Sequence, residues 1–289
     1  MSKDAILTHL EDNILTITIN RPEKRNAIDM NTMHDLADIF KQVNLDDETR
    51  CVIVTGAGDY FCAGADISDG AKVFDSPEIE DLLNGPYDKD AINRISPGSQ
   101  VALSIYNCYK PVIAAINGPA AGIGATMILP MDYRLMSDTA KLGYVFTKRG
   151  IVPEAGSSWF LPRVVGMSKA SDWLLSGRLI EPQEALDAGL VRGIYKPEDL
   201  LPAAKQIAQD LIATTSAVSV ACTRQLLWKM SGPADLDDAT ALETTCFIDM
   251  ATSPEAMEGM QSFLEKRPPQ FPGKVTKNMP RLFKWWGKS

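Results

Sequence analysis

Residues 61–68 read FCAGADIS and follow the apolar run CVIVTG at residues 51–56. An apolar run of this length that ends at a glycine is typical of a buried strand. The small residues after it leave main-chain N–H groups open to approach, because no bulky side chain covers them. Turns built in this way bind oxygen atoms of ligands. We therefore expect a strand, a turn and a polar ligand in this part of the chain.

The same design recurs farther along the chain. KPVIAAING at residues 110–118 predicts a second buried strand, which leads into the turn GPAAGIGAT at 118–126. A helix is expected between the two strands, over about 101–108. Each turn is expected to open a helix, whose first amides lack intrahelical partners and favour negative charge. Two converging turns would hold one oxyanion, whereas each turn taken singly is also typical of a tight strand-to-helix connection.

The remaining pattern predicts an α/β body followed by helices. NILTITIN at 13–20 alternates as a strand does, and DYRLMS at 132–137 indicates a third buried strand. Asn31 is expected to cap a helix that extends to about Leu45. In the second half, the expected helical stretches cover 156–177, 181–189, 200–215, 219–230, 237–252 and 254–267.

Strands that alternate with helices, followed by helices alone, predict two regions. The first is an α/β core over 1–200, and the second is a helical region with a tail over 201–289. Residues 68–100 are rich in Asp, Gly, Pro and Ser, which predicts a long surface loop.

The composition argues against several classes of protein. Of the 289 residues, 45% are hydrophobic and 23% charged, and no apolar run approaches the ~18 residues of a membrane span. Acidic residues near the N-terminus argue against a signal peptide, so we expect a cytoplasmic protein. The five cysteines lack paired spacing, which predicts neither a disulfide framework nor a metal site. The formal charge of −8 argues against general binding to nucleic acid.

Five segments in this order resemble the enoyl-CoA hydratase/isomerase (crotonase) superfamily: NRPEKRNAI, FCAGADI, KPVIAAINGPAAGIG, GIVPEAGSSWFLPRVVG and GLV. The resemblance extends from about Ile14 to Arg267. It implies a spiral of repeated ββα units with a C-terminal helical region that forms trimers or paired trimers. It also implies an acyl-CoA thioester as substrate, bound in an extended pocket, with no further cofactor and no stable insertion into a membrane.

In such a protein the two glycine turns would form an oxyanion hole. Matching the motifs of the family assigns its two donors to the backbone N–H groups of Ala65 and Ile123. When a proton leaves the carbon next to a thioester, the carbonyl becomes an enolate, and preorganised donors stabilise its charge. Asp66 is expected to cap a following helix rather than to enter the chemistry. The residues expected to line this part of the substrate site are Ala27, Ala63, Gly64, Asp66, Ile67 and Gly122.

Coenzyme A is polyanionic, so an acidic protein must gather positive charge locally to bind it. The resemblance supports Lys24 and Arg25 after the first strand, and Lys266 with Arg267 after the last long helix. Each is equally typical of ordinary solvated surface. Phe263 is similar in position to a residue that lines the acyl pocket of a neighbouring subunit.

Adding water to an enoyl-CoA takes two carboxylates in this family, and neither is present at the usual positions. Thr126 and Phe146 stand where the hydratases of the family carry their acids, so both are expected in the substrate pocket. Neither side chain transfers a proton at neutral pH. The usual hydratase machinery is therefore absent.

Glu154 supplies a carboxyl directly after Pro153, where the hydratase pattern has glycine. In the Δ3,Δ2-enoyl-CoA isomerases of the family the acid sits at this position, and isomerisation needs one base. The resemblance thus points to an isomerase with Glu154 as acid and base. A Pro-Glu pair is also typical of the first turn of a helix, and burial would be needed to raise the carboxyl pKa.

Two alternatives stay open. Hydration would be possible if Asp69 or Glu243 joined Glu154 as a second acid. A homologue that binds acyl-CoA without catalysis would need no acid at all. The two histidines, His9 and His34, match no catalytic position of the family and are interpreted as structural or exposed.

Overall fold

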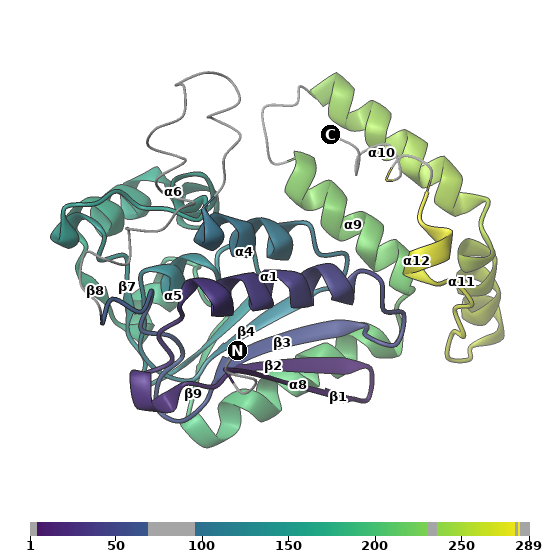
Figure 1. The fold of residues 1–289 in the computed structure, drawn as a ribbon. Coiled ribbons are helices and arrows are strands. Elements are labelled where there is room, and N and C mark those ends of the chain that lie inside the picture. The colour runs from purple at the N-terminus through teal and green to yellow at the C-terminus, as the bar shows by residue number, and fades with distance from the viewer. Residues whose placement is uncertain (1–4, 69–95, 231–235, 281–282, 284–289) are drawn as a thin grey trace.

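The computed structural model describes residues 5–68, 96–230, 236–280 and 283 (Figure 1). Its centre is a six-stranded sheet in which β1 runs antiparallel to β2 and every other neighbouring pair is parallel. The order across the sheet is β1 (Ile6–Glu11), β2 (Ile14–Ile19), β3 (Cys51–Gly56), β4 (Val112–Ile116), β6 (Tyr133–Ser137) and β9 (Gly193–Tyr195). The strands predicted over 13–20, 51–56, 110–118 and 132–137 are all confirmed.

Alternating side chains of the sheet supply two apolar layers. Val52 and Val54 of β3 join the core under α1 (Met30–Val43) and α4 (Pro97–Tyr106). Ile53 points the other way, into a second cluster with α8 (Pro197–Ala213). Figure 1 shows α1 and α4 on one face of the sheet and α8 on the other. Burial on both faces explains why β3 and β4 are apolar at nearly every position.

Helix α1 begins two residues earlier than a cap at Asn31 would allow. Asp29 is the N-cap, and its Oδ1 accepts hydrogen bonds from the Thr32 N and Oγ1 atoms, each at 2.8 Å. The expectation that Asn31 caps this helix is therefore wrong, because Asn31 lies inside the first turn, where its side chain is exposed. The carboxylate also favours the positive end of the helix dipole.

A second, three-stranded sheet of very short strands lies beside the central one. It consists of β5 (Ala120–Ala121), β7 (Leu142–Gly143) and β8 (Leu179–Ile180), and α5 (Ile123–Thr126) follows β5 directly. Strands of two residues carry no readable periodicity, so the sequence pattern missed them. Of two 3₁₀ turns, η1 (Pro22–Lys24) lies between β2 and α1, and η3 (Thr147–Arg149) lies between β7 and α6.

The helices predicted for the second half of the chain are confirmed in order. They are α6 (Ser157–Ser176), α7 (Pro182–Asp187), α8, α9 (Ala217–Met230), α10 (Leu236–Ala251) and α11 (Pro254–Glu265), and a short α12 (Val275–Asn278) follows. Because α8 packs on the sheet, the helix that spans residue 200 belongs to the core of the molecule. The predicted boundary near residue 200 itself stays a prediction.

The expected loop over 68–100 is shorter at its C-terminal end than predicted. Ser96 caps α4, whose first residue is Pro97, so residues 97–100 belong to a helix. Ser at the cap with Pro at the first helical position is a strong start signal that the composition of the segment concealed. The remaining part, 69–95, lies outside the described residues.

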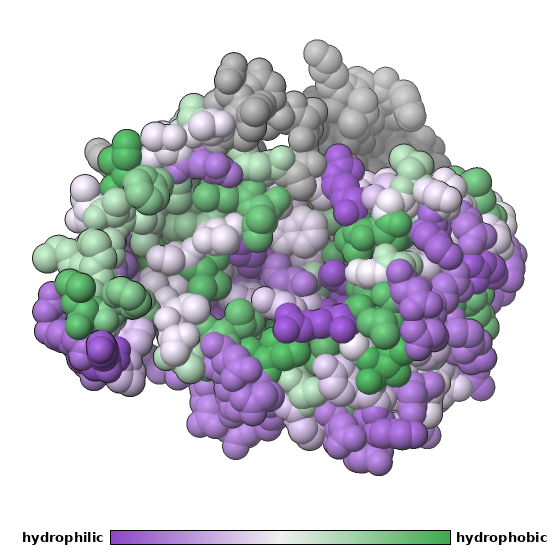
Figure 2. Space-filling model, turned by 180° about the vertical axis from the view of Figure 1, so that it is seen from behind, coloured by the Kyte–Doolittle hydropathy of each residue, from purple (hydrophilic) through white to green (hydrophobic). Residues whose placement is uncertain are grey.

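Helices α10 and α11 expose a row of large apolar side chains. These are Phe247, Ile248, Met257, Met260, Phe263 and Leu264. Figure 2 shows hydrophobic residues gathered at this end of the molecule, which lies on the left in that view. No helix among the described residues is both long and apolar enough to cross a bilayer.

Candidate active site

The two glycine turns lie side by side. Cys62 and Ala120 form a parallel bridge, and the Ala121 N–H donates to the Cys62 carbonyl at 3.0 Å. Gly64 has a φ of +110°, and a Cβ atom there would lie 3.0 Å from the Ala121 carbonyl oxygen. Glycine is needed at this position because both the backbone conformation and the close approach exclude a side chain.

The second turn brings α5 against the first. The Gly122 N–H donates to the Gly143 carbonyl at 3.0 Å, which fixes the turn before the helix. A Cβ atom on Gly124 would collide with the carbonyl oxygen of Cys62. The glycine in the first turn of α5 thus lets the helix approach the Cys62 backbone closely.

The two predicted donors are left without internal acceptors. The bridge between Ile28 and Ala65 uses the Ile28 N–H, which donates to Gly64, and the Asp66 N–H, which donates back to Ile28. The Ala65 N–H takes no part in this bridge. Ile123 opens α5, so its N–H has no partner within the helix. Within the described part of the chain, neither amide has a hydrogen-bond acceptor, so both remain available to a ligand. That they bind the same oxygen atom stays a prediction.

Glu154 lies in a turn before α6 and not within that helix. Ala155 and Gly156 both have positive φ, at +56° and +68°, and α6 begins at Ser157. The interpretation of Glu154 as a first-turn residue of the following helix is therefore wrong. Two consecutive residues of left-handed backbone conformation thus separate Glu154 from α6.

The carboxyl of Glu154 instead lies against the N-terminus of α4. Ser96 donates a hydrogen bond from Oγ to Glu154 Oε2 at 3.0 Å. Gly98, in the first turn of α4, leaves the space that the carboxylate occupies, because a Cβ atom there would collide with Oε1. The sequence pattern missed Ser96 and Gly98, which were assigned to the loop, although the Ser-Pro-Gly start signal marks them.

The environment of Glu154 suits a proton carrier. Burial raises the pKa of the Glu154 carboxyl above its ordinary value, and the hydrogen bond from Ser96 lowers it in part. Desolvation disfavours the carboxylate, whereas a donor to the carboxylate favours it. A carboxyl shifted towards neutrality exchanges protons more readily at physiological pH, as acid–base catalysis requires.

The hydratase acid positions carry no proton donor of this kind. Thr126 is fully buried at the end of α5, where its Oγ1 lies 3.4 Å from the Ile123 carbonyl oxygen. Phe146 belongs to the same apolar core as Ile123 and Ala155. Neither position therefore places a carboxyl in the core beside the second turn.

Two basic side chains of the segment after β2 reach the first turn, and binding of coenzyme A by Lys24 and Arg25 stays a prediction. Lys24 forms an ion pair with Asp66 at 2.7 Å, and Arg21 reaches the same carboxylate oxygen at 3.0 Å. These bonds, led by that from Lys24, hold the pKa of Asp66 well below its usual range. The Arg25 carbonyl accepts from the Ala63 N–H at 3.0 Å. Asp66 thus joins the first turn to the segment after β2; whether it also caps a following helix falls outside the described residues.

The remaining residues that were predicted to line the substrate site at this turn differ in their solvent exposure. Ala27 is buried, and its carbonyl accepts from Arg21 at 2.6 Å. Ala63, Ala65 and Ile67 are exposed. The segment after β2 therefore supports the first turn from behind, while Ala63, Ala65 and Ile67 of that turn face solvent.

Phe263 and Lys266 are not brought to the turns within one chain. Figure 1 places α11 at the opposite end of the molecule from α5. Phe263 is 81% exposed, and Lys266 forms the exposed C-cap of α11. Arg267 pairs with carboxylates of its own segment, Glu258 and Glu265.

The other acids considered do not lie beside Glu154 in the described structure. Glu243 is exposed on α10, where it lines a cavity with residues of α9. Asp69 lies outside the described residues. His9 is exposed, with its side chain 71% accessible.

Replacing Ser96 by alanine should raise the pKa of Glu154, because the carboxylate loses its hydrogen bond from the hydroxyl. The N-cap bond to the Ser99 N–H is lost as well, which should cost about 1 kcal/mol of unfolding free energy. Titration of ¹³C-labelled glutamate by NMR measures the first effect and chemical unfolding the second. Ser96→Thr, which keeps a hydroxyl, is the matched control; an unchanged Glu154 titration in Ser96→Ala would contradict the assignment.

Known proteins resemble this chain in sequence over most of its length. Residues 9–274 match the family model described as enoyl-CoA hydratase/isomerase. The chain is 35% identical over 261 residues to enoyl-CoA hydratase AFT3-1 from Alternaria alternata, covering 90% of this chain and 83% of that protein. It is 32% identical over 280 residues to 1,2-epoxyphenylacetyl-CoA isomerase from Escherichia coli K12, with 93% and 98% covered.

The fold agrees with the same comparison. A crystal structure of a probable enoyl-CoA hydratase/isomerase from Mycobacterium abscessus matches with a TM-score of 0.82 and 28% identity, over 94% of this chain and all of that one. The predicted crotonase-like α/β architecture is therefore confirmed.

Proposed function

Because the chain belongs to the enoyl-CoA hydratase/isomerase family and is a crotonase-type enzyme, we propose that it isomerises a 3-enoyl-CoA to the 2-enoyl-CoA. Glu154 is the acid and base of this reaction, and the N–H groups of Ala65 and Ile123 are the oxyanion donors. The substrate is an acyl-CoA thioester, and the protein supplies all groups that the reaction needs.

The proposed reaction moves one proton and one double bond. The Glu154 carboxylate removes a proton from C2, and the electron pair of that bond extends the C3–C4 double bond into a dienolate whose charge rests on the thioester oxygen. The two amides hold that oxygen, each contributing about 3 kcal/mol to the stabilisation of the charge. Protonated Glu154 then returns the proton to C4, and the double bond settles between C2 and C3.

The observation that carries the proposal is the placement of one half-buried carboxyl, that of Glu154, beside the N-terminus of α4. Glu154 has a raised pKa and a hydrogen-bond partner in Ser96, whereas Thr126 and Phe146 leave the hydratase positions without acids. One base suffices for isomerisation, and hydration by the usual route needs two.

The names of several relatives favour hydration as the second candidate. A direct assay separates the candidates. The purified protein is expected to form the conjugated 2-enoyl thioester from a 3-enoyl-CoA, followed by its absorbance, and to leave crotonyl-CoA largely unhydrated. Loss of the crotonyl-CoA absorbance through water addition would favour hydration instead. Binding of an acyl-CoA without exchange of its C2 protons in heavy water would favour a non-catalytic homologue.

We also infer that the active form contains several copies of the chain, as a trimer or a dimer of trimers. Phe263 and Lys266 lie far from the turns in one chain, so they would reach an acyl-CoA only from a neighbouring copy. The exposed apolar row on α10 and α11 supports such an association, because contiguous apolar surface is typical of subunit interfaces.

A further inference from the structure

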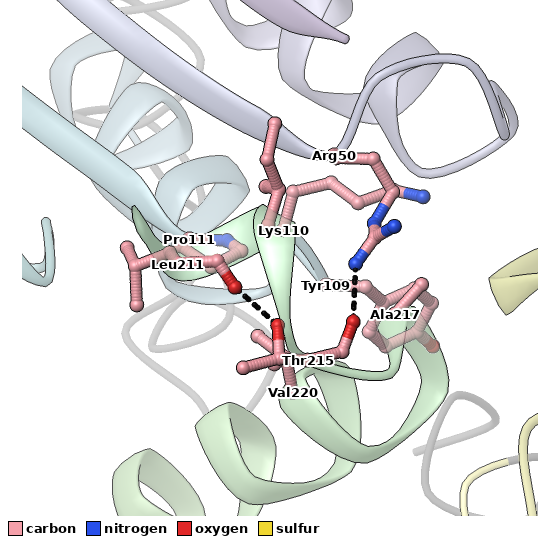
Figure 3. A pocket seen from close by; sticks show the side chains of 9 residues that line it. Arg50, Tyr109, Lys110, Pro111, Leu211, Thr215, Ala217 and Val220 are labelled. Atoms are coloured by element: carbon pink, nitrogen blue, oxygen red, sulfur yellow. Dashed lines mark hydrogen bonds between the residues drawn. The ribbon is translucent and has the colours of Figure 1, made fainter. Parts of the chain in front are cut away.

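A small, partly open cavity lies at the edge of the sheet where β3 and β4 begin. Arg50 directly precedes β3. Lys110 lies two residues before β4, which is the strand that neighbours β3. The end of α8, the connection that follows it and the start of α9 close the cavity from the other side (Figure 3). The lining residues are Arg50, Tyr109, Lys110, Pro111, Leu211, Ile212, Thr215, Ala217 and Val220.

One of the two cations in this cavity lacks a hydrogen-bond partner, and the other has one. Lys110 is 2% exposed, and its Nζ has no hydrogen-bond partner among the described residues. Arg50 donates from one guanidinium nitrogen to the Thr215 carbonyl at 2.8 Å, a bond drawn in Figure 3. A buried ammonium without an acceptor is costly, so a partner in the cavity is expected.

Nearby carboxylates do not fill this role. The negative charges of Asp46 and Asp47 favour the protonated form of Lys110, and the charge of Glu255 favours the protonated form of Arg50. None of them lines the cavity, and each accepts hydrogen bonds elsewhere. Their hydroxyl partners are Thr49, Thr276 and Ser216, respectively. The charges near the cavity are thus partly balanced, but the cavity itself contains donors and no acidic acceptor.

We propose that this cavity binds one small inorganic anion of the size of chloride, held by the Lys110 ammonium and the Arg50 guanidinium. The cavity volume of about 10 Å³ is that of about one water molecule, so the cavity excludes a phosphate group and admits a monatomic anion only if the long Lys110 side chain shifts slightly. Val220, in the first turn of α9, lines the same cavity, and the positive end of that helix adds to the attraction for an anion. The bound ion links the sheet edge to the connection between α8 and α9.

Bromide provides a direct test on the unmodified protein. Crystals grown in sodium bromide should show an anomalous-scattering peak in the cavity, within contact distance of Lys110 Nζ. A peak there supports the site. Density at that point without anomalous signal, as for an ordered water, would overturn it.

Thermal unfolding provides the second test. Replacing sodium gluconate by sodium chloride at equal concentration should raise the wild-type Tm by about 2–4 °C at saturating chloride. Lys110→Met should lose this increment whatever its own Tm, and Lys205→Met, which removes a surface lysine paired with Glu11, should keep it. An equal increment in wild type and Lys110→Met would refute the site.

Discussion

Glu154→Gln should lower kcat/KM for the isomerisation of a 3-enoyl-CoA at least about 100-fold, because the amide cannot remove a proton from C2. Glutamine has nearly the same shape, and it can still accept the hydrogen bond from Ser96. The loss should therefore appear in kcat, measured by steady-state kinetics, with little change in KM. The control is Glu48→Gln, which makes the same change at an exposed glutamate in the loop before β3. Full activity in Glu154→Gln would remove this residue from the mechanism.

The same variant should be more stable than the wild type at neutral pH. Burial raises the pKa of Glu154 above its ordinary value of 4.5, so the folded protein holds this proton more tightly than the unfolded chain. Below the unfolded pKa both states are protonated, and the carboxyl carries no penalty. The penalty grows as the pH rises through the folded pKa. Urea unfolding should therefore show a gain for Glu154→Gln at neutral pH that disappears in acid; an equal gain at both would contradict the burial of a charged carboxylate.

Gly124→Ala should damage both activity and stability. The new Cβ atom would meet the carbonyl oxygen of Cys62, a backbone atom that has little freedom to move. Helix α5 would have to shift away from the first turn, and the Ile123 N–H would move with it. We expect kcat to fall about 10²-fold or more through the displaced donor. The unfolding free energy should fall by about 1–3 kcal/mol through overpacking.

A second glycine variant, outside the site, tests whether the losses in Gly124→Ala arise at the turn and not from any replacement of glycine by alanine. A Cβ atom on Gly259 of α11 would make only ordinary contact, 3.5 Å from the Phe271 ring. Gly259→Ala should leave kcat unchanged and stabilise the helix by up to about 1 kcal/mol. Circular dichroism during urea unfolding and initial-rate kinetics compare the two variants. Normal activity in Gly124→Ala would contradict an oxyanion donor at Ile123.

Much of the fold was predictable because local patterns and tertiary contacts agree. The apolar runs of β3 and β4 are long enough to show burial on both faces, and the turns after them carry the glycines that close approach demands. The helices from α6 to α11 show their periodicity or composition over at least six residues each. By contrast, β5, β7 and β8 have two residues apiece, too few for any period to appear.

The sequence by itself determined the family, the two glycine turns and Glu154 as the leading candidate acid, because these depend on residue types at fixed spacing along the chain. Only the tertiary structure decided what surrounds that acid. Ser96 and Gly98 lie more than fifty residues before Glu154, and the fold brings its carboxyl to them. Burial, hydrogen bonding and hence the proton affinity of a side chain arise from contacts between distant segments, which spacing along the chain does not contain.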